Sequence, residues 1–134
     1  MTHQHSIRMY YEDTDAGGVV YYANYLRFAE RARTEYLRSI GFENSEIRDN
    51  YGILIVVKSV EAEYLSPARL DDVLVMRSRL VSVKNTSFVM EQKAYRDDVC
   101  IFNMTIVLVC VDDGQGKPAR IPDNLKTAFQ KDMV

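Results

Sequence analysis

The stretch ANYLRFAERARTEYLRSI, residues 23–40, decides the fold because it is the longest run of helical periodicity in the chain. Its apolar side chains share one broad face: Tyr25, Leu26, Phe28, Ala29, Ala32, Tyr36, Leu37 and Ile40. Its charged side chains take the other face: Arg27, Arg31, Arg33, Glu35 and Arg38. Gly41 follows as a helix stop. The pattern predicts one amphipathic helix of about five turns, with the charged face in solvent.

Around this helix the sequence alternates with a period of two, which is typical of β-strands. The first alternating run covers residues 5–12. The later runs are a strand from Ile53 to the Ser66-Pro67 break, then residues 73–83, 87–96 and 99–111, with turns at residues 84–86 and 97–98. In the first of these later strands, the predicted apolar face is Val56, Val60, Ala62 and Tyr64.

Two further features complete the predicted fold. Residues 99–111 are apolar on both faces except at Asn103 and Thr105, which indicates an interior strand covered on both sides. Pro122 opens a short last helix. We therefore predict a single α+β domain over residues 1–134, a five-stranded antiparallel sheet wrapped around one long central helix. Because one helix leaves a sheet face and the sheet edges uncovered, we also expect a dimer or a larger assembly.

Composition excludes several classes of function. The net charge is −2 and the pI is about 5.7, without a cluster of basic residues, which argues against a nucleic-acid binder. The chain has no apolar run of the roughly 20 residues that a membrane span needs. Its first residues lack the pattern of a signal peptide. Cys100 and Cys110 lie in one predicted strand, about 33 Å apart and too far to bridge, so we expect a reducing compartment, the cytoplasm.

Asp15 is the main candidate for chemistry because it lies on a glycine-rich turn directly before the long helix. The stretch Tyr11 to Tyr22 reads YEDTDAGGVVYY. Backbone N–H groups near Tyr22 and Ala23, at the helix start, have no helical partner and can stabilise an oxyanion. Gly18 allows a ligand to approach the backbone closely. The structural alternative is a turn whose polar side chains only bond their own backbone.

Other kinds of site fit this region less well. A calcium loop starting at Asp13 fails because Gly17 and Asn24 occupy its fifth and twelfth positions, and the glycines match no nucleotide-binding motif. A histidine triad or a zinc site lacks material, since His3 and His5 are the chain's two histidines, and we expect no metal. We expect Glu30 to be solvated or at an interface. We expect most of the nearby tyrosines to pack at the helix–sheet seam: Tyr10, Tyr11, Tyr21, Tyr22 and Tyr25.

Residues 11–21, with Asn24-Tyr25-Leu26 and Glu30-Arg31-Ala32-Arg33 after them, strongly resemble the YbgC-like branch of the 4-hydroxybenzoyl-CoA thioesterase family. Further similarity lies at residues 63–68 and 71–72, so the resemblance spans nearly the whole chain. It implies a hot-dog fold, in which a five-stranded sheet wraps around one helix. It also implies homodimers or homotetramers with active sites at the subunit interface.

The resemblance implies a role for particular residues. The family's catalytic aspartate falls on Asp15, as nucleophile or general base, and the N–H that polarises the thioester carbonyl falls on Tyr22. We expect Gly18 and Tyr21 to contact the acyl-CoA, and Lys84 and Ser87, in a predicted turn, to lie where relatives contact the CoA phosphates. No cofactor is expected. YbgC-type relatives usually have His at the position of Tyr22, so a histidine-assisted route is excluded here.

Three functions remain in order of preference. The first is an acyl-CoA thioesterase that releases a carboxylic acid and free CoA. The second is a non-catalytic hot-dog module that binds acyl-CoA or acyl carrier protein, which the tyrosine at position 22 keeps open. The third is a hot-dog dehydratase, which would need a histidine beside a carboxylate.

Overall fold

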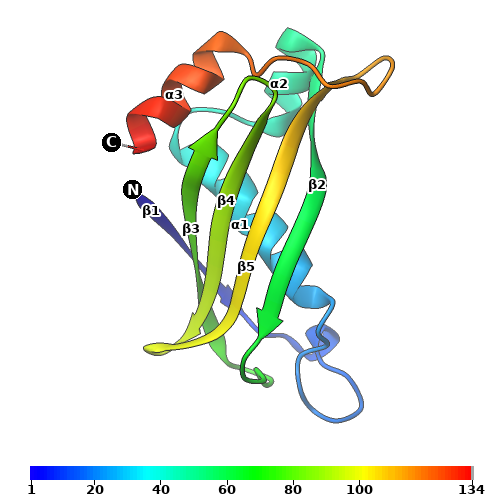
Figure 1. The fold of residues 1–134 in the computed structure, drawn as a ribbon. Helices are drawn as coiled ribbons and strands as arrows, with labels where there is room; N and C mark the ends of the chain where they lie inside the picture. The colour runs from blue at the N-terminus through cyan, green and yellow to red at the C-terminus, as the bar shows by residue number, and fades with distance from the viewer. Residues whose placement is uncertain (134) are drawn as a thin grey trace.

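The computed structural model describes residues 1–133, which form one antiparallel sheet with helices on one side and at one end (Figure 1). The elements in chain order are β1 (Thr2–Arg8), the 3-10 turn η1 (Tyr11–Asp13), α1 (Asn24–Ser39), α2 (Asn44–Tyr51), β2 (Ile53–Tyr64), β3 (Val73–Val83), β4 (Ser87–Arg96), β5 (Val99–Asp112) and α3 (Asp123–Met133). The strand order is β1-β3-β4-β5-β2, with every neighbouring pair antiparallel. The predicted α+β fold, with five strands and one long helix, is confirmed.

Helix α1 forms where the periodicity predicts it and packs lengthwise on the sheet. Its buried residues are Asn24, Tyr25, Phe28, Ala29, Ala32, Tyr36 and Leu37. They meet inward-facing strand residues such as Met90 and Phe102 in one continuous core. Leu26 was predicted to be buried but is 40% exposed, because it lies on the flank of α1 away from the sheet.

Strand β2 differs from its predicted pattern because of a β-bulge. The register with β5 shifts between Val57 and Ser59, which leaves Lys58 as an extra residue. An extra residue reverses the alternation, so Val57 and Val60 both face inward while Val56 faces the other way. The prediction that Val56 shares a face with Val60 is therefore wrong. β5 lies between β4 and β2, as an interior strand should.

The first strand is shorter and earlier than predicted. β1 ends at Arg8 because the chain turns into η1, and the Asp13 carboxylate accepts the Tyr10 N–H at 2.8 Å. Met9 still exchanges backbone hydrogen bonds with Asp71 and Asp72, and this capping bond replaces strand pairing after it. Tyr11, predicted to lie on the strand, is 82% exposed.

Two helices close one end of the sheet. α2, which the sequence pattern did not predict, buries only Ile47 and ends at Gly52, whose φ of +66° suits glycine. α3 begins after Pro122, as predicted, and buries Leu125 and Phe129. Within residues 1–133, no helix is long and apolar enough to cross a membrane.

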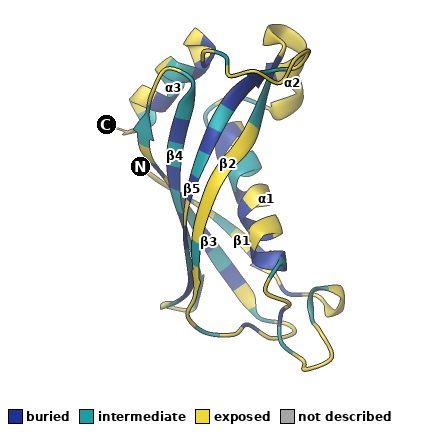
Figure 2. Ribbon diagram, turned by 45° about the vertical axis from the view of Figure 1, so that its right-hand side comes forward, coloured by how far each residue is buried: buried dark blue, intermediate teal, exposed yellow. Residues whose placement is uncertain are grey.

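The sheet keeps an open edge and an open face. β2 pairs only with β5, so its outer edge is free in this chain, and Figure 2 shows β2 largely exposed. On the face away from α1, the β5 residues Val107 and Val109 are only half-buried. Among the described residues nothing covers this face, so the cover predicted for both sides of β5 is not provided within the chain.

Candidate active site

The Asp15 loop is a small hairpin-like structure between η1 and α1. Thr14 forms a bridge to Val20, and Val19 forms a bridge to Arg69 in the segment after β2. The Asp15 N–H donates to the Val19 carbonyl at 2.9 Å, and the Gly18 N–H donates to the Asp15 carbonyl at 3.0 Å. Gly18 has a φ of +78°, which a side chain would strain. These bonds fix the backbone that carries Asp15.

The Asp15 carboxylate is exposed and has one bond to its own loop. Its Oδ1 accepts the Gly17 N–H at 2.9 Å, which is the local turn that the sequence left open as an alternative. The second carboxylate oxygen accepts no hydrogen bond from residues 1–133. The carboxylate is thus held in place by one oxygen and available through the other.

The start of α1 lies directly after this loop and has no side-chain cap. Asn24 donates through its side chain to the Asp13 carbonyl at 2.9 Å and so holds the loop instead of capping the helix. Asn24 N–H and Tyr25 N–H donate back to the carbonyls of Tyr21 and Tyr22. The N–H groups of Tyr22 and Ala23 have no recorded acceptor within residues 1–133. They are the free donors that an oxyanion site requires.

A row of tyrosines lines the site. The ring centroids of Tyr21 and Tyr22 are 4.9 Å apart, and Tyr22 meets Tyr64 at the end of β2 at 5.9 Å. The pKa of Tyr21 is raised above its ordinary value, mainly by the adjoining Tyr22 phenol and also by the charge of Asp15.

The prediction that most of these tyrosines pack at the helix–sheet seam is wrong. Of the five, only Tyr25 is buried, and its hydroxyl accepts the Ala68 N–H at 3.2 Å. Tyr21 and Tyr22 are 46% and 60% exposed. They stay outside because the loop that carries them projects beyond the end of the sheet (Figure 1).

The chain brings together only part of the predicted site. Asp15, Gly18, Tyr21 and Tyr22 share one loop at one end of the molecule. Lys84 and Ser87 flank the β3–β4 turn, where the Lys84 N–H donates to the Ser87 carbonyl at 2.8 Å. This turn lies at the opposite end of the sheet (Figure 1), so one protomer does not place Lys84 or Ser87 beside Asp15.

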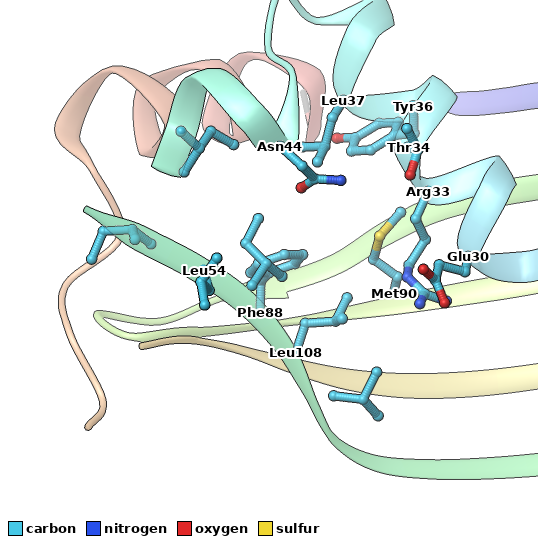
Figure 3. Close-up of a pocket in the computed structure, with 14 residues that line it drawn as sticks. Glu30, Arg33, Thr34, Tyr36, Leu37, Asn44, Leu54, Phe88, Met90 and Leu108 are labelled. Carbon is cyan, nitrogen blue, oxygen red and sulfur yellow. The ribbon is translucent and has the colours of Figure 1, made fainter. Parts of the chain in front are cut away.

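A cavity of about 240 Å³ lies between α1, α2 and the sheet (Figure 3), and no residue of the Asp15 loop lines it. Apolar residues from β2, β4 and β5 form most of its wall, while Glu30 and Arg33 of α1 lie at one end. Arg33 was predicted to be in solvent, but its side chain is partly buried and donates to the Gln92 side-chain carbonyl at 3.0 Å. The prediction is wrong because Arg33 lies one turn after Ala29 and shares its buried flank. Burial lowers the pKa of Arg33, and the charge of Glu30 acts in the opposite direction.

Sequence reasoning missed this cavity, although one signal pointed to it. Gln92 alternates with Met90 and Ala94 on the inward face of β4, where a polar side chain needs a partner. Its amide donates to the Ala29 carbonyl at 2.9 Å and to the Ser78 hydroxyl at 3.0 Å.

Among residues 1–133, no cluster of three or more His, Cys, Asp or Glu side chains is arranged to hold a metal ion.

Known proteins resemble this chain over nearly its whole length. The acyl-CoA thioesterase YbgC of Haemophilus influenzae is 42% identical over 92% of this chain and 90% of its own length. The acyl-CoA thioester hydrolase YbgC of Escherichia coli is 41% identical over 93% of both chains. The crystal structure of a probable thioesterase from Bartonella henselae superposes with a TM-score of 0.87 and 32% identity, over 91% of this chain and all of that one.

The likeness to solved thioesterases confirms the hot-dog fold that the resemblance implied. The sequence model of the thioesterase-like superfamily matches residues 11–129. This range includes the Asp15 loop and the four strands β2 to β5, and it leaves out β1. The chain therefore belongs to the thioesterase-like superfamily.

Proposed function

We propose that this protein hydrolyses acyl-CoA thioesters to a carboxylic acid and free CoA at the Asp15 loop. One observation carries the proposal: an exposed carboxylate stands directly before a helix start whose Tyr22 and Ala23 N–H groups have no acceptor within residues 1–133. The relatives named as acyl-CoA thioesterases support it. Hydrolysis consumes only water, so the reaction calls for no cofactor. We take residues 1–134 as one domain with this activity.

In the proposed reaction, the thioester carbonyl oxygen accepts a hydrogen bond from the Tyr22 N–H. This donor stabilises the negative charge that develops on that oxygen when the carbonyl carbon is attacked. Gly18 and Tyr21 line the approach to the carbonyl.

Asp15 acts in one of two ways. As a nucleophile, its carboxylate attacks the carbonyl carbon, CoA leaves as the thiolate, and water then hydrolyses the acyl-aspartyl anhydride. As a general base, it takes a proton from water, and the hydroxide attacks the carbonyl carbon directly. A single turnover in 18O-labelled water separates the two, because only the first puts label into the Asp15 side chain.

We further propose that two chains pair through the open edge of β2. Val57 and Val60 on this strand are 49% and 39% exposed, which is unusual for inward-facing residues of a sheet. Antiparallel pairing of two β2 edges about their midpoints brings the Asp15 end of one protomer to the β3–β4 end of the other. Lys84 and Ser87 of a second protomer then reach the CoA bound at the first. A homodimer, or a homotetramer of two such pairs, is the expected assembly.

The oligomer is tested with Val60→Lys, which places a charge on the paired edge. Chromatography with light scattering should give a dimer or tetramer for the wild type and a monomer for the variant. A monomeric wild-type protein would overturn the pairing. We place the protein in the cytoplasm, because Cys100 and Cys110 are both free thiols and suit a reducing compartment.

The proposed activity is tested by following free thiol release from a panel of short-chain, long-chain and aromatic acyl-CoAs. Hydrolysis of at least one of them above the uncatalysed rate is the expected result. A second function, a non-catalytic module for acyl-CoA or acyl carrier protein, has one observation in its favour: Asp15 already bonds Gly17 within its own loop. Micromolar binding by calorimetry, without turnover of any thioester in the panel, would replace the first proposal with the second.

A further inference from the structure

The cavity under α1 is lined by a positively charged side chain that forms no ion pair with the described residues. Arg33 is the only guanidinium group that lines it. Its Nη1 donates to the neutral side-chain carbonyl of Gln92, and no carboxylate among the described residues lies within ion-pair distance. Its other nitrogens make no hydrogen bond among the described residues and are not fully buried, so a ligand can reach them. A partly buried cation gains from an anionic partner, because withdrawing a lone charge from water is costly.

The rest of the cavity suits a hydrocarbon chain. Figure 3 shows Phe88, Met90 and Leu108 rising from the sheet below α1, with Arg33 extending toward Met90 at one end. The wall is mostly apolar and includes Ile47 of α2. At about 30 Å³ for each water-sized group, the cavity of about 240 Å³ holds roughly eight non-hydrogen atoms. An apolar cavity with the Arg33 guanidinium at one end, beside the more exposed Glu30, can take a short chain that ends in an anion.

We propose that this cavity binds the acyl part of the substrate, and that Arg33 selects acyl groups of about six to eight carbons that end in a carboxylate. The inference rests on the proposed thioesterase function and deepens it by naming the substrate class. In the proposed dimer, the cavity lies beside the N-terminal half of β2, which faces the Asp15 end of the other protomer. The thioester lies at Asp15 of one chain, and its acyl group extends into the cavity of the partner.

Two neighbours of Arg33 set the strength of this selection. Glu30 is exposed and lies one turn earlier on the same helix, where its charge competes with an incoming carboxylate. Gln92 holds the guanidinium without neutralising it. Removing the Glu30 charge should therefore raise the preference for a carboxylate, and placing a charge at Gln92 should abolish it.

The test compares acyl-CoAs of equal length that differ only at the far end: adipoyl-CoA with hexanoyl-CoA, and suberoyl-CoA with octanoyl-CoA. The measured quantity is the ratio of kcat/KM within each pair. For the wild type the carboxylated member should be preferred about 10-fold or more, as expected for a charge-assisted bond in a partly dry site. Arg33→Met should lower kcat/KM for the carboxylated member by about 10- to 100-fold and change the other member by less than about 3-fold.

Matched variants separate selection from folding. Arg31→Met removes the same charge from the exposed face of the same helix and should leave the ratio at its wild-type value. Arg33→Lys keeps the charge and should retain part of the preference. Glu30→Gln should raise the ratio. Gln92→Glu supplies Arg33 with a carboxylate partner and, although it places an oxygen against the Ala29 carbonyl, should lower the ratio to about 1 where it folds; Glu30→Gln, at an exposed position, tests the inference even if Arg33→Met folds poorly.

Each outcome decides the matter. Equal kcat/KM for both members in the wild type, or a preference that survives Arg33→Met, overturns the inference. A fall in both members together, with a lower Tm, makes Arg33 only a structural partner of Gln92 and also overturns it. If the wild type hydrolyses no thioester, the proposed function fails, and calorimetric affinities for the same pairs of acyl-CoAs then test Arg33 independently.

Discussion

Tyr25→Phe tests how the Asp15 loop is attached to the rest of the fold. The Tyr25 hydroxyl accepts the Ala68 N–H at 3.2 Å, and both residues are buried. The Ala68 carbonyl in turn accepts the Val20 N–H at 2.8 Å, at the end of the Asp15 loop. One phenol oxygen therefore joins the start of α1 to the segment on which the loop rests.

The size of the effect follows from what the substitution leaves behind. The ring stays and keeps its stacking on Phe102, with centroids 5.1 Å apart, so the apolar burial hardly changes. The buried Ala68 N–H loses its acceptor, which costs about 1–2 kcal/mol of unfolding free energy for a bond of this length. For a chain of this size, that free energy lowers Tm by about 3–10 °C.

The assay is urea unfolding and thermal melting of the wild type and Tyr25→Phe, each with its kcat/KM for the best thioester. Tyr11→Phe is the matched control, because Tyr11 is 82% exposed and its hydroxyl makes no recorded bond within residues 1–133. It should stay within about 0.5 kcal/mol of the wild type. If Tyr25→Phe is equally neutral, the bond to Ala68 does not anchor the loop and the reasoning is refuted.

Three further predictions concern the loop, the buried network and pH. Gly17→Ala places a Cβ 3.3 Å from Asp15 Oδ1 and should lower kcat/KM by about 3- to 10-fold with little change in Tm. Gly18 has a φ of +78° with open space around it, so Gly18→Ala should cost about 1 kcal/mol of unfolding free energy. The reverse pattern in the activity and melting data would contradict both predictions. Gln92→Leu strands Arg33 and Ser78 and should cost about 2–4 kcal/mol in urea unfolding, and a neutral result would mean that the network rearranges freely. Burial raises the pKa of the Cys110 thiol from 9.0 to about 11, so above about pH 9 the folded state keeps a proton that the unfolded state loses. The unfolding free energy should therefore fall between about pH 9 and 11. A Cys110→Ala variant that shows the same fall would disprove this assignment.

The sequence predicted the elements whose signal is local. β3 and β4 have the predicted bounds, and α1 differs by one residue at each end, because their periodicity is strong, although the register between β3 and β4 shifts between Leu80 and Ser82. The bulge at Lys58 was not predictable, because one extra residue reverses a face without leaving a local signature. α2 buries a single residue, so its sequence carries almost no helical hydrophobic periodicity that could have predicted it.

The same distinction applies to the site. Asp15, Gly18, Tyr21 and Tyr22 are neighbours in sequence, so a turn followed by a helix was enough to place them together. Arg33 was misplaced because its partner Gln92 comes from another element, 59 residues away. Lys84 and Ser87 lie at the opposite end of the sheet from Asp15, so the fold of one protomer does not bring them to the Asp15 loop. Their place at the site depends on a second chain, which a local pattern does not encode.

The most direct measurement of the central claim is kcat/KM of Asp15→Asn for the best thioester, with Asp13→Asn as its control. The neighbouring Asp13 carboxylate accepts the Tyr10 N–H, and the side-chain oxygen of an asparagine can accept the same hydrogen bond. Asp13→Asn should therefore keep wild-type activity. With an unchanged Tm, Asp15→Asn should lose at least about 100-fold in kcat/KM, the loss expected when a nucleophile or general base is removed. An Asp15→Asn protein that stays within about 3-fold of the wild type would contradict the account.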